Sequence, residues 1–233
     1  LINTKCGWDL NMNRTYNIDE IKKGIENTLE KFGKINVLQL HNPRNEIKNW
    51  DLIVEMFNYY KKKKLIKYSG VSLARNYYFS SKVLNSFDFI QDEFNLLRID
   101  SIKKMSAYKN TLAGRSIFAN GILTDGFNKE TIFHRNDHRN SWLKGKRKNN
   151  ILMQKKILKR LTQDNISQFA MNFTMQYKMF DKFIFGFRTV KQFDSFLKNI
   201  INLKPLNKET IKKIVSLHKN NQFFLNKKLR YNN

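Results

Sequence analysis

The feature that most constrains this chain is an alternation of short apolar segments with longer amphipathic ones. The short segments, rich in β-branched and aromatic residues, lie at residues 1–5, 36–41, 68–73, 87–91, 113–118 and 183–186. Between them apolar residues recur with helical spacing. Strands and helices that alternate at intervals of roughly 20 to 35 residues are typical of right-handed βαβ units with a parallel sheet. The sequence therefore predicts an α/β fold with six such units.

The spacing of apolar residues also predicts where the helices lie. They are expected at residues 19–32, 46–64, 77–84, 151–161, 166–177, 190–201 and 208–218. In the first helix Ile21, Ile25, Leu29 and Phe32 form one stripe, and Asp19 is a suitable N-cap. Pro205 separates the last two helices, because proline interrupts a helix. Residues 121–150 show no clean period and are rich in Asn, Lys and Arg, so they are expected to form a long loop.

Two architectures fit six βα units: a doubly wound sheet, or an eight-stranded barrel that lacks two units. The chain has 233 residues, of which 41% are hydrophobic, enough for one sizeable core. It shows no internal repeat and no low-complexity linker. We therefore expect residues 1–233 to form a single domain, with a C-terminal helix and tail at residues 206–233.

Several classes of protein are excluded by composition. Cys6 is the single cysteine, which excludes a disulfide framework and a cysteine-based zinc site. No run approaches the roughly 18 apolar residues of a membrane span, and no secretory signal is visible, so a cytoplasmic location is expected. His134, Asp137 and His138 invite a metal interpretation, but no third histidine is near, and we predict no metal site.

The strong positive charge allows two interpretations. Lys and Arg number 44 against 19 acidic residues, a formal net charge of +25. Such a charge could indicate a nucleic-acid partner. However, Lys, Asn, Ile and Phe are all plentiful, as an A/T-rich genome would cause, and the densest basic runs, residues 61–64 and 144–148, are short. We favour codon bias on a solvated surface, with a preference for anionic ligands such as phosphate-bearing cofactors as the alternative.

Polar residues stand where the predicted strands end, which is where parallel α/β proteins place their chemistry. They are Lys5, His41, Ser72, Gln91, Arg115, Ser116, Gly186 and Arg188. Neither GxGxxG nor GxxxxGK[ST] is present, so the usual phosphate loops are absent. Structural roles remain open for each: Lys5 could have an exposed ammonium, His41 could begin a loop, and Arg115 could pair with Glu93 or Asp125. Ser72 and Gln91 could simply be satisfied polar ends of strands, and Cys6 a small buried side chain.

An ordered set of short motifs resembles the aldo-keto reductases across residues 2–201. The motifs are Thr4-Lys5, Leu38-Gln39-Leu40-His41-Asn42-Pro43, Lys67-Tyr68-Ser69-Gly70-Val71-Ser72, Ile90-Gln91, Asn95-Leu96-Leu97, Arg115-Ser116-Ile117-Phe118, Gly121-Ile122-Leu123, Gly186-Phe187-Arg188 and Gln192. The resemblance implies an incomplete (β/α)8 TIM barrel, strands 3 to 8, that belongs to an NADPH- or NADH-dependent oxidoreductase of aldehydes or ketones. The Arg115-Ser116 form resembles a branch found beside bacterial surface-sugar genes, which implies a sugar-derived carbonyl.

The resemblance also assigns roles. Lys5 matches the lysine that lowers the pKa of the proton-donating tyrosine, and His41 matches the histidine that orients the carbonyl or assists proton transfer. Ser72 and Gln91 match positions that hold the nicotinamide carboxamide. Ser116 matches the pyrophosphate position. The adenosine-phosphate segment is matched by Gly186, Arg188 and Gln192, with Arg188 a partner for a 2′-phosphate.

Four features depart from the family pattern. Leu73 and Phe196 replace asparagines, and Arg115 stands where many members stack a tyrosine on the nicotinamide. The family's catalytic aspartate and tyrosine would precede Leu1, and Tyr16 comes too late in the order to replace that tyrosine. We therefore expect an N-terminally truncated chain that, because of its open strand edges, expresses poorly or associates, and that does not turn over substrate by itself. The alternatives are a non-catalytic cofactor-binding relative and a basic nucleic-acid-binding module.

Overall fold

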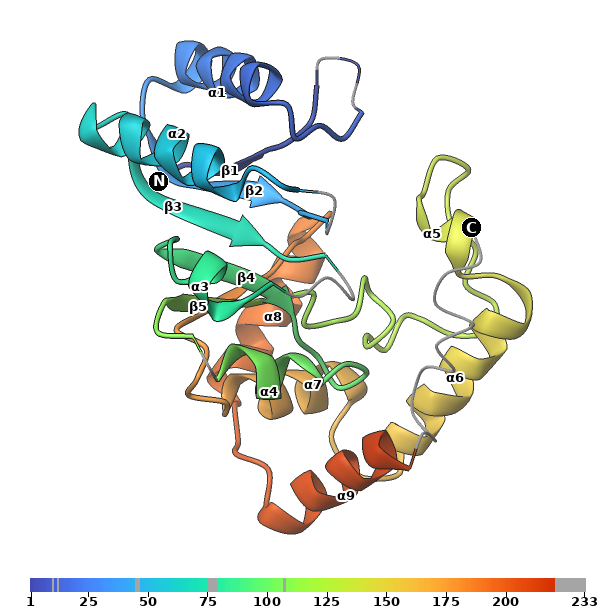
Figure 1. Ribbon diagram of the computed structural model, residues 1–233. Coiled ribbons are helices and arrows are strands. Elements are labelled where there is room, and N and C mark those ends of the chain that lie inside the picture. The colour runs from blue at the N-terminus through green and yellow to red at the C-terminus, as the bar shows by residue number, and fades with distance from the viewer. Residues whose placement is uncertain (10, 12, 45–46, 75–78, 107, 221–233) are drawn as a thin grey trace. The chain divides into compact units, whose positions relative to one another are not determined.

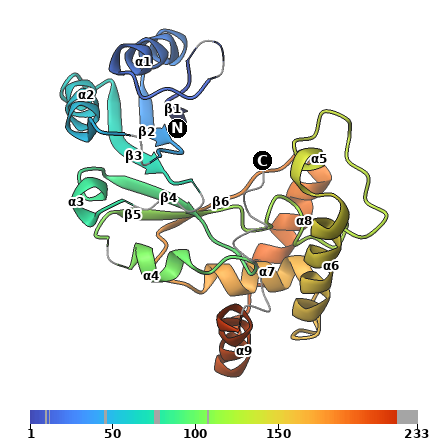
Figure 2. The ribbon, with the colours of Figure 1, turned by 45° about the vertical axis from the view of Figure 1, so that its right-hand side comes forward.

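Six strands form one sheet, and they follow one another in the order of the chain. The computed structural model describes residues 1–9, 11, 13–44, 47–74, 79–106 and 108–220. The strand order is β1-β2-β3-β4-β5-β6 (Figure 1; β6 is labelled in Figure 2). The strands are β1 (Asn3–Cys6), β2 (Ile35–His41), β3 (Ile66–Ser72), β4 (Phe89–Glu93), β5 (Thr111–Arg115) and β6 (Lys182–Ile184). Neighbours from β1 to β5 pair in parallel. A doubly wound sheet reverses its strand order at a switch point, which this order lacks.

The helices alternate with the strands, as a (β/α) barrel requires. They are α1 (Ile18–Phe32), α2 (Trp50–Lys62), α3 (Ser81–Leu84), α4 (Ser101–Met105), α5 (Arg139–Trp142), α6 (Gly145–Lys159), α7 (Ile166–Met175), α8 (Val190–Ile201) and α9 (Lys208–Lys219). The predicted α/β fold, an incomplete (β/α) barrel of about six units, is confirmed.

The contacts among described residues divide the chain into two compact units. Unit 1 comprises Leu1–Glu93, Ser101–Arg115 and Met179–Lys182. Unit 2 comprises Phe94–Asp100, Ser116–Lys178 and the residues from Phe183 onward. The single domain expected from the sequence for residues 1–233 stays a prediction.

In unit 1, α1 and α2 lie together on one side of β1–β3 (Figures 1 and 2). Ile21 and Ile25 of α1 are fully buried, as their spacing predicts, whereas Phe32, predicted on the same stripe, ends the helix with 57% of its surface exposed. The N-cap is Asn17 rather than the predicted Asp19: the Asn17 side chain accepts hydrogen bonds from the backbone amides of Asp19 and Glu20. Asp19 instead lies in the first turn, where its charge suits the helix dipole.

The face of the sheet that points away from α1 and α2 carries a small apolar layer, which precedes the carboxyl ends of the strands. Val37, Phe89 and Ala113 form a buried cluster there. Gly70 lies in register between Gln39 of β2 and Phe89 of β4. A Cβ at position 70 would lie 2.7 Å from the Phe89 carbonyl oxygen and 3.0 Å from Gln39 Cγ. The sheet is therefore closely packed at Gly70, and a side chain there has no room.

We expect Gly70→Ala to lower the free energy of unfolding by about 1–3 kcal/mol, the usual effect of overpacking a closed site. The new methyl group meets backbone, which can move only if the β3–β4 pairing moves. Urea unfolding monitored by circular dichroism measures the effect. Gly126→Ala is the matched control, because a Cβ at position 126 meets nothing within 4 Å; an equal effect of both variants would contradict this account.

Unit 2 is built around α7, whose residues are buried along most of its length. Phe173 of α7 stacks on Phe94 with ring centroids 5.7 Å apart, and Tyr177 meets both rings edge-on. The Gln168 side-chain amide donates to Asn172 Oδ1 and to the carbonyl oxygens of Asn199 and Asn202, which ties the end of α8 to α7. An aromatic core and a side-chain amide network thus hold this unit together.

Several element boundaries differ from the prediction. The segment 121–150 is not all loop, since it contains α5 and the first turns of α6. The strands predicted at 113–118 and 183–186 end earlier, at Arg115 and Ile184, so that Ser116 and Gly186 follow their strands. Ser116 has a positive φ of 58°, which a strand does not allow. The helices predicted from 46 and 77 begin at Trp50 and Ser81; residues 46, 77 and 78 lie outside the described residues.

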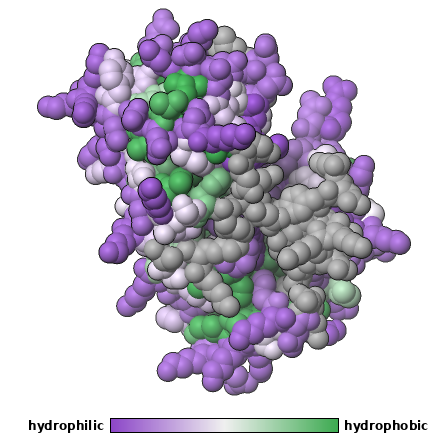
Figure 3. All heavy atoms as spheres, viewed as in Figure 1, coloured by the Kyte–Doolittle hydropathy of each residue, from purple (hydrophilic) through white to green (hydrophobic). Residues whose placement is uncertain are grey.

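The surface of the described residues is largely hydrophilic, as the high content of charged residues predicts. On the face shown in Figure 3, hydrophilic side chains cover most of the area that is coloured by hydropathy. Within the described part of the chain, no helix has the length and apolar character needed to cross a membrane.

Candidate active site

Five of the predicted site residues come together at the carboxyl ends of the strands in unit 1. His41 is in register with Ser72, and Ser72 with Gln91. Register partners on neighbouring strands project to the same face of a sheet. The last residues of β2 and β3 and the middle residue of β4 thus form a polar row across one end of this face.

Lys5 lies on the same face, one step below His41. It pairs in register with Gln39, which precedes His41 by two residues on β2. Because side chains two apart on a strand share a face, and adjacent strands lie about 4.8 Å apart, Lys5 and His41 are diagonal neighbours. The electrostatics are consistent with this placement, because the positive charge of Lys5 is one of the causes that lower the pKa of His41. The structure therefore brings these two predicted residues together.

The electrostatic environment keeps His41 neutral. Burial lowers the pKa of His41 to about 4, and the positive charges of Lys5, Arg115 and Arg14 add to this effect. The pKa of Lys5 is also lowered, first by burial and then by Arg115. At neutral pH the imidazole is therefore uncharged and lies among three cationic side chains.

Ser72 and Gln91 are both buried, with 1% and 3% of their surface exposed. The side-chain oxygen of Gln91, Oε1, is buried with no hydrogen-bond partner in the described structure. A buried amide oxygen without a partner costs free energy, which a donor from a bound ligand would recover. Gln91 is thus a candidate acceptor for a ligand.

Arg115 ends β5 in register with Glu93 of β4. Its guanidinium donates a hydrogen bond of 2.9 Å to the backbone oxygen of Leu73. Asp125, the other carboxylate considered from the sequence, accepts from the amide of Ile166 and the hydroxyl of Ser167. Arg115 therefore braces the chain that follows β3 while contributing its charge to the Lys5–His41 region.

The loop after β1 contributes residues that sequence reasoning missed. The indole Nε1–H of Trp8 donates a hydrogen bond of 2.7 Å to Nδ1 of His41. The guanidinium carbon of Arg14 lies 5.3 Å from the centre of the Trp8 ring. The hydroxyl of Tyr16 donates to the backbone oxygen of Asn42, directly after His41. The available sequence signal was Gly7-Trp8 immediately after Lys5-Cys6, a glycine where the chain turns away from a strand.

The other predicted residues, Ser116, Gly186, Arg188 and Gln192, belong to unit 2. The amide of Arg188 donates to Gln192 Oε1 at 2.8 Å, so these two residues form one loop at the start of α8. The Arg188 guanidinium pairs with Asp137 at 2.8 Å and leaves 64% of its side chain exposed. Asp137 also binds Arg139, and these partners hold the pKa of the Asp137 carboxyl far below its usual range.

The sequence also singled out Cys6 and the loop that carries His134, Asp137 and His138. Cys6 is buried, and burial raises the pKa of its thiol to about 12, which makes it unreactive. Asp137, part of the metal interpretation, is engaged by the two arginines. Among the residues that the structure describes, no group of three or more His, Cys, Asp or Glu side chains could hold a metal ion.

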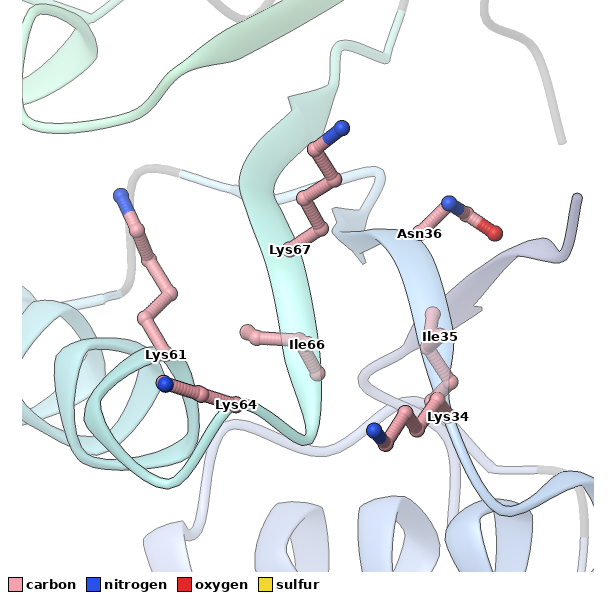
Figure 4. Close-up of a pocket in the computed structure, with 7 residues that line it drawn as sticks. All are labelled: Lys34, Ile35, Asn36, Lys61, Lys64, Ile66 and Lys67. Carbon is pink, nitrogen blue, oxygen red and sulfur yellow. The ribbon is translucent and has the colours of Figure 1, made fainter.

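A cavity of about 420 Å³ lies at the opposite ends of the strands. Figure 4 shows its lining: Lys34, Ile35, Asn36, Lys61, Lys64, Ile66 and Lys67. Ile35 and Ile66 begin β2 and β3, whereas His41 and Ser72 end them. Of the lysines, Lys61 pairs with Asp88 at 2.6 Å, and Lys67 lies over the ring of Tyr68. This cavity contains none of the candidate residues.

Known proteins resemble this chain in fold and in sequence pattern. The glycerol dehydrogenase AKR11B4 from Gluconobacter oxydans matches with a TM-score of 0.72 and 19% identity, over 93% of this chain and 72% of that one. The aldo-keto reductase AKR11C1 from Bacillus halodurans, in its holo form, matches with a TM-score of 0.72 and 18% identity, with the same coverage. A search among curated proteins finds no match. The model of the "Aldo/keto reductase family" matches residues 1–219, so this chain belongs to the aldo/keto reductase family.

Proposed function

We propose that this protein reduces an aldehyde or ketone with a hydride from NADPH or NADH. Family membership implies this class of reaction, and one observation in the structure supports it most. Lys5, next to last in β1, and His41, the last residue of β2, lie on neighbouring parallel strands and share one face. The carboxyl ends of barrel strands are where such folds place their catalytic groups.

The residues present fit a nicotinamide cofactor. The Gln91 Oε1 atom is a buried acceptor without a partner, and the buried hydroxyl of Ser72 lies beside it in register. Together they could hold a primary carboxamide, which is both donor and acceptor. The family resemblance assigns Ser116 to the pyrophosphate position and Gly186, Arg188 and Gln192 to the adenosine-phosphate segment, and these residues belong to unit 2. When bound, the reduced nicotinamide supplies the hydride.

The exposed guanidinium of Arg188 favours NADPH over NADH in this proposal. A 2′-phosphate would have to share Arg188 with Asp137, which already holds it at 2.8 Å. Arginine binds phosphate through two parallel N–H groups, so one guanidinium can keep a carboxylate contact while it binds a phosphate oxygen. The cofactor is therefore expected to be NADPH, with NADH as the weaker ligand.

The chain's own groups would polarise the carbonyl. The Lys5 ammonium would stabilise the deprotonated form of a neighbouring proton donor and so lower that donor's pKa. His41, uncharged at neutral pH, would donate a hydrogen bond to the carbonyl oxygen as negative charge develops there. The family's proton-donating tyrosine and its aspartate match no residue of this chain, so we propose that this chain alone does not turn over.

The test compares the 233-residue chain with the same chain extended by any residues that its reading frame encodes before Leu1 or after Asn233, which is termed the complete product. Oxidation of NADPH is followed with a panel of short aldehydes, ketones and sugar-derived carbonyls, and binding of NADPH is measured by quenching of protein fluorescence. The proposal predicts turnover by the complete product and none by the 233-residue chain. Absence of both binding and turnover in the complete product would refute it.

A non-catalytic cofactor-binding relative is the second candidate. It is favoured by Phe196, which replaces an asparagine of the family and has no polar group that could hydrogen-bond to an adenine. Its ring lies near those of Phe185, Phe187 and Phe193. It is also favoured by Arg115, which stands where many members of the family stack a tyrosine ring and whose guanidinium is hydrogen-bonded to the Leu73 oxygen. Tight binding of NADPH by the complete product with no turnover of any carbonyl would select this candidate.

A further inference from the structure

We infer that Trp8 is a positioning residue that fixes His41 as its neutral Nε2–H tautomer, so that a single N–H of His41 remains to meet a substrate. The role toward a substrate rests on the proposed function, whereas the tautomer does not. The inference is carried by the bond from Trp8 Nε1 to His41 Nδ1, 2.7 Å long.

The donor chemistry of the two rings decides the tautomer. An indole N–H can only donate, so the atom that faces it must accept. His41 Nδ1 is therefore unprotonated, and the proton of the neutral imidazole lies on Nε2. The charged imidazole, with a proton on both nitrogens, would set two N–H groups against each other across 2.7 Å.

The loop that carries Trp8 is built to hold it beside His41. Gly7 has a φ of +103°, and a Cβ there would lie 3.3 Å from Leu40 Cδ1, so only glycine suits the turn out of β1. The amide of Thr15 donates back to the Gly7 oxygen at 3.1 Å, and Trp8 and Arg14 form an antiparallel bridge. The Arg14 guanidinium then covers the Trp8 ring at 5.3 Å, a cation–π contact.

A second attachment ties the same loop to the end of β2. The hydroxyl of Tyr16 donates to the Asn42 oxygen at 3.2 Å. Asn42 has a positive φ of 50°, so the chain bends sharply just after His41. The loop is therefore hydrogen-bonded at two successive positions at the end of β2: to the imidazole of His41 and to the backbone oxygen of Asn42.

The charges around His41 act in the same direction. Lys5 on β1, Arg14 in the loop and Arg115 on β5 are the charged groups that influence its imidazole, and all three are cations. Each disfavours a second proton on the ring. His41 is thereby restricted to donating a hydrogen bond through Nε2–H and does not serve as a source of protons at neutral pH. The family resemblance left two roles open for this histidine, and the inference selects orientation of the carbonyl over proton transfer.

The experiment detects the hydrogen bond itself. In the complete protein labelled with ¹⁵N and without cofactor, a correlation spectrum that reports ¹⁵N–¹⁵N coupling across N–H···N hydrogen bonds should link Trp8 Nε1 to His41 Nδ1. The ¹⁵N shifts of His41 should show Nδ1 unprotonated and Nε2 protonated at neutral pH. His41→Gln assigns the imidazole signals among the four histidines.

Trp8→Phe and Trp142→Phe form a matched pair. Trp142 also lies under an arginine, Arg147 at 5.2 Å, and near a histidine ring, His138 at 6.3 Å. Trp8→Phe should abolish the coupling and, through misplacement of His41, lower kcat/KM about 10–100-fold, as loss of a supporting hydrogen bond does elsewhere. Trp142→Phe should leave both unchanged.

A proton on Nδ1 of His41 in the folded wild-type protein would overturn the inference, and so would absence of the coupling there. Both results come from the wild-type protein, so they stand even if Trp8→Phe fails to fold. If the coupling is present but no carbonyl compound is reduced, the proposed function fails and the tautomer assignment holds.

Discussion

Lys5→Met is expected to lower kcat of the complete protein about 100- to 10,000-fold, the range typical of lost acid–base assistance. Methionine keeps much of the apolar stem of lysine but removes the ammonium that lies diagonal to His41 on the neighbouring strand. Without that charge the pKa of a neighbouring proton donor rises, and the donor loses acidity. Steady-state rates of NADPH oxidation, measured at saturating carbonyl substrate, report the effect.

Lys67→Met is the control for Lys5→Met. Lys67 also lies on a strand of unit 1, but near the amino end of β3, over the ring of Tyr68. Lys67→Met also removes one positive charge, but at the amino ends of the strands. It should change kcat less than about twofold, because this charge is far from the site and is screened by solvent. Equal losses in the two variants would show that Lys5 acts through net charge or folding rather than at the site.

Phe173→Ala is expected to destabilise unit 2 by about 3–5 kcal/mol, the usual cost of removing a fully buried aromatic side chain. Phe173 has no exposed surface, and its ring lies within 6 Å of those of Phe94 and Tyr177. Truncation leaves a cavity that the rigid end of α7 cannot fill. Urea unfolding, followed by circular dichroism, gives the change in the free energy of unfolding.

Phe193→Ala provides the comparison. Phe193 is in the same unit and also meets other rings, but 44% of it is exposed. Because much of the Phe193 side chain is already in contact with solvent, Phe193→Ala removes little buried apolar surface. It should lower the free energy of unfolding by about 1 kcal/mol or less. A loss for Phe173→Ala no larger than that for Phe193→Ala would contradict the aromatic core described for unit 2.

The strands and their polar ends could be predicted because their signals are local. Runs such as Val37-Leu38-Gln39-Leu40 are apolar at all but one position, and parallel strands bring their carboxyl ends to one edge. This reasoning placed Lys5, His41, Ser72 and Gln91 at one end of the sheet without any contact information. It also gave the bounds of α8, whose apolar residues repeat regularly from Val190 to Ile201.

Other features depend on contacts between distant residues, which no local pattern encodes. Trp8 and His41 are 33 residues apart, and Asp137 and Arg188 are 51 apart. The first turn of α6 was missed because it reads Gly-Lys-Arg-Lys, without an apolar stripe. The cap of α1 was misplaced by two residues because both Asn17 and Asp19 are good capping residues, and the sequence alone does not separate them.

The most direct test of the central claim, that Lys5 and His41 face each other at one end of the sheet, is the pKa of His41 measured by NMR in the wild-type protein and in Lys5→Met. The wild-type value should be about 4, and removal of the Lys5 charge should raise it, because the imidazolium then meets one cation fewer. A His41 pKa that is the same in both proteins would show that the two side chains do not share a site, and the proposed arrangement for carbonyl reduction would be wrong.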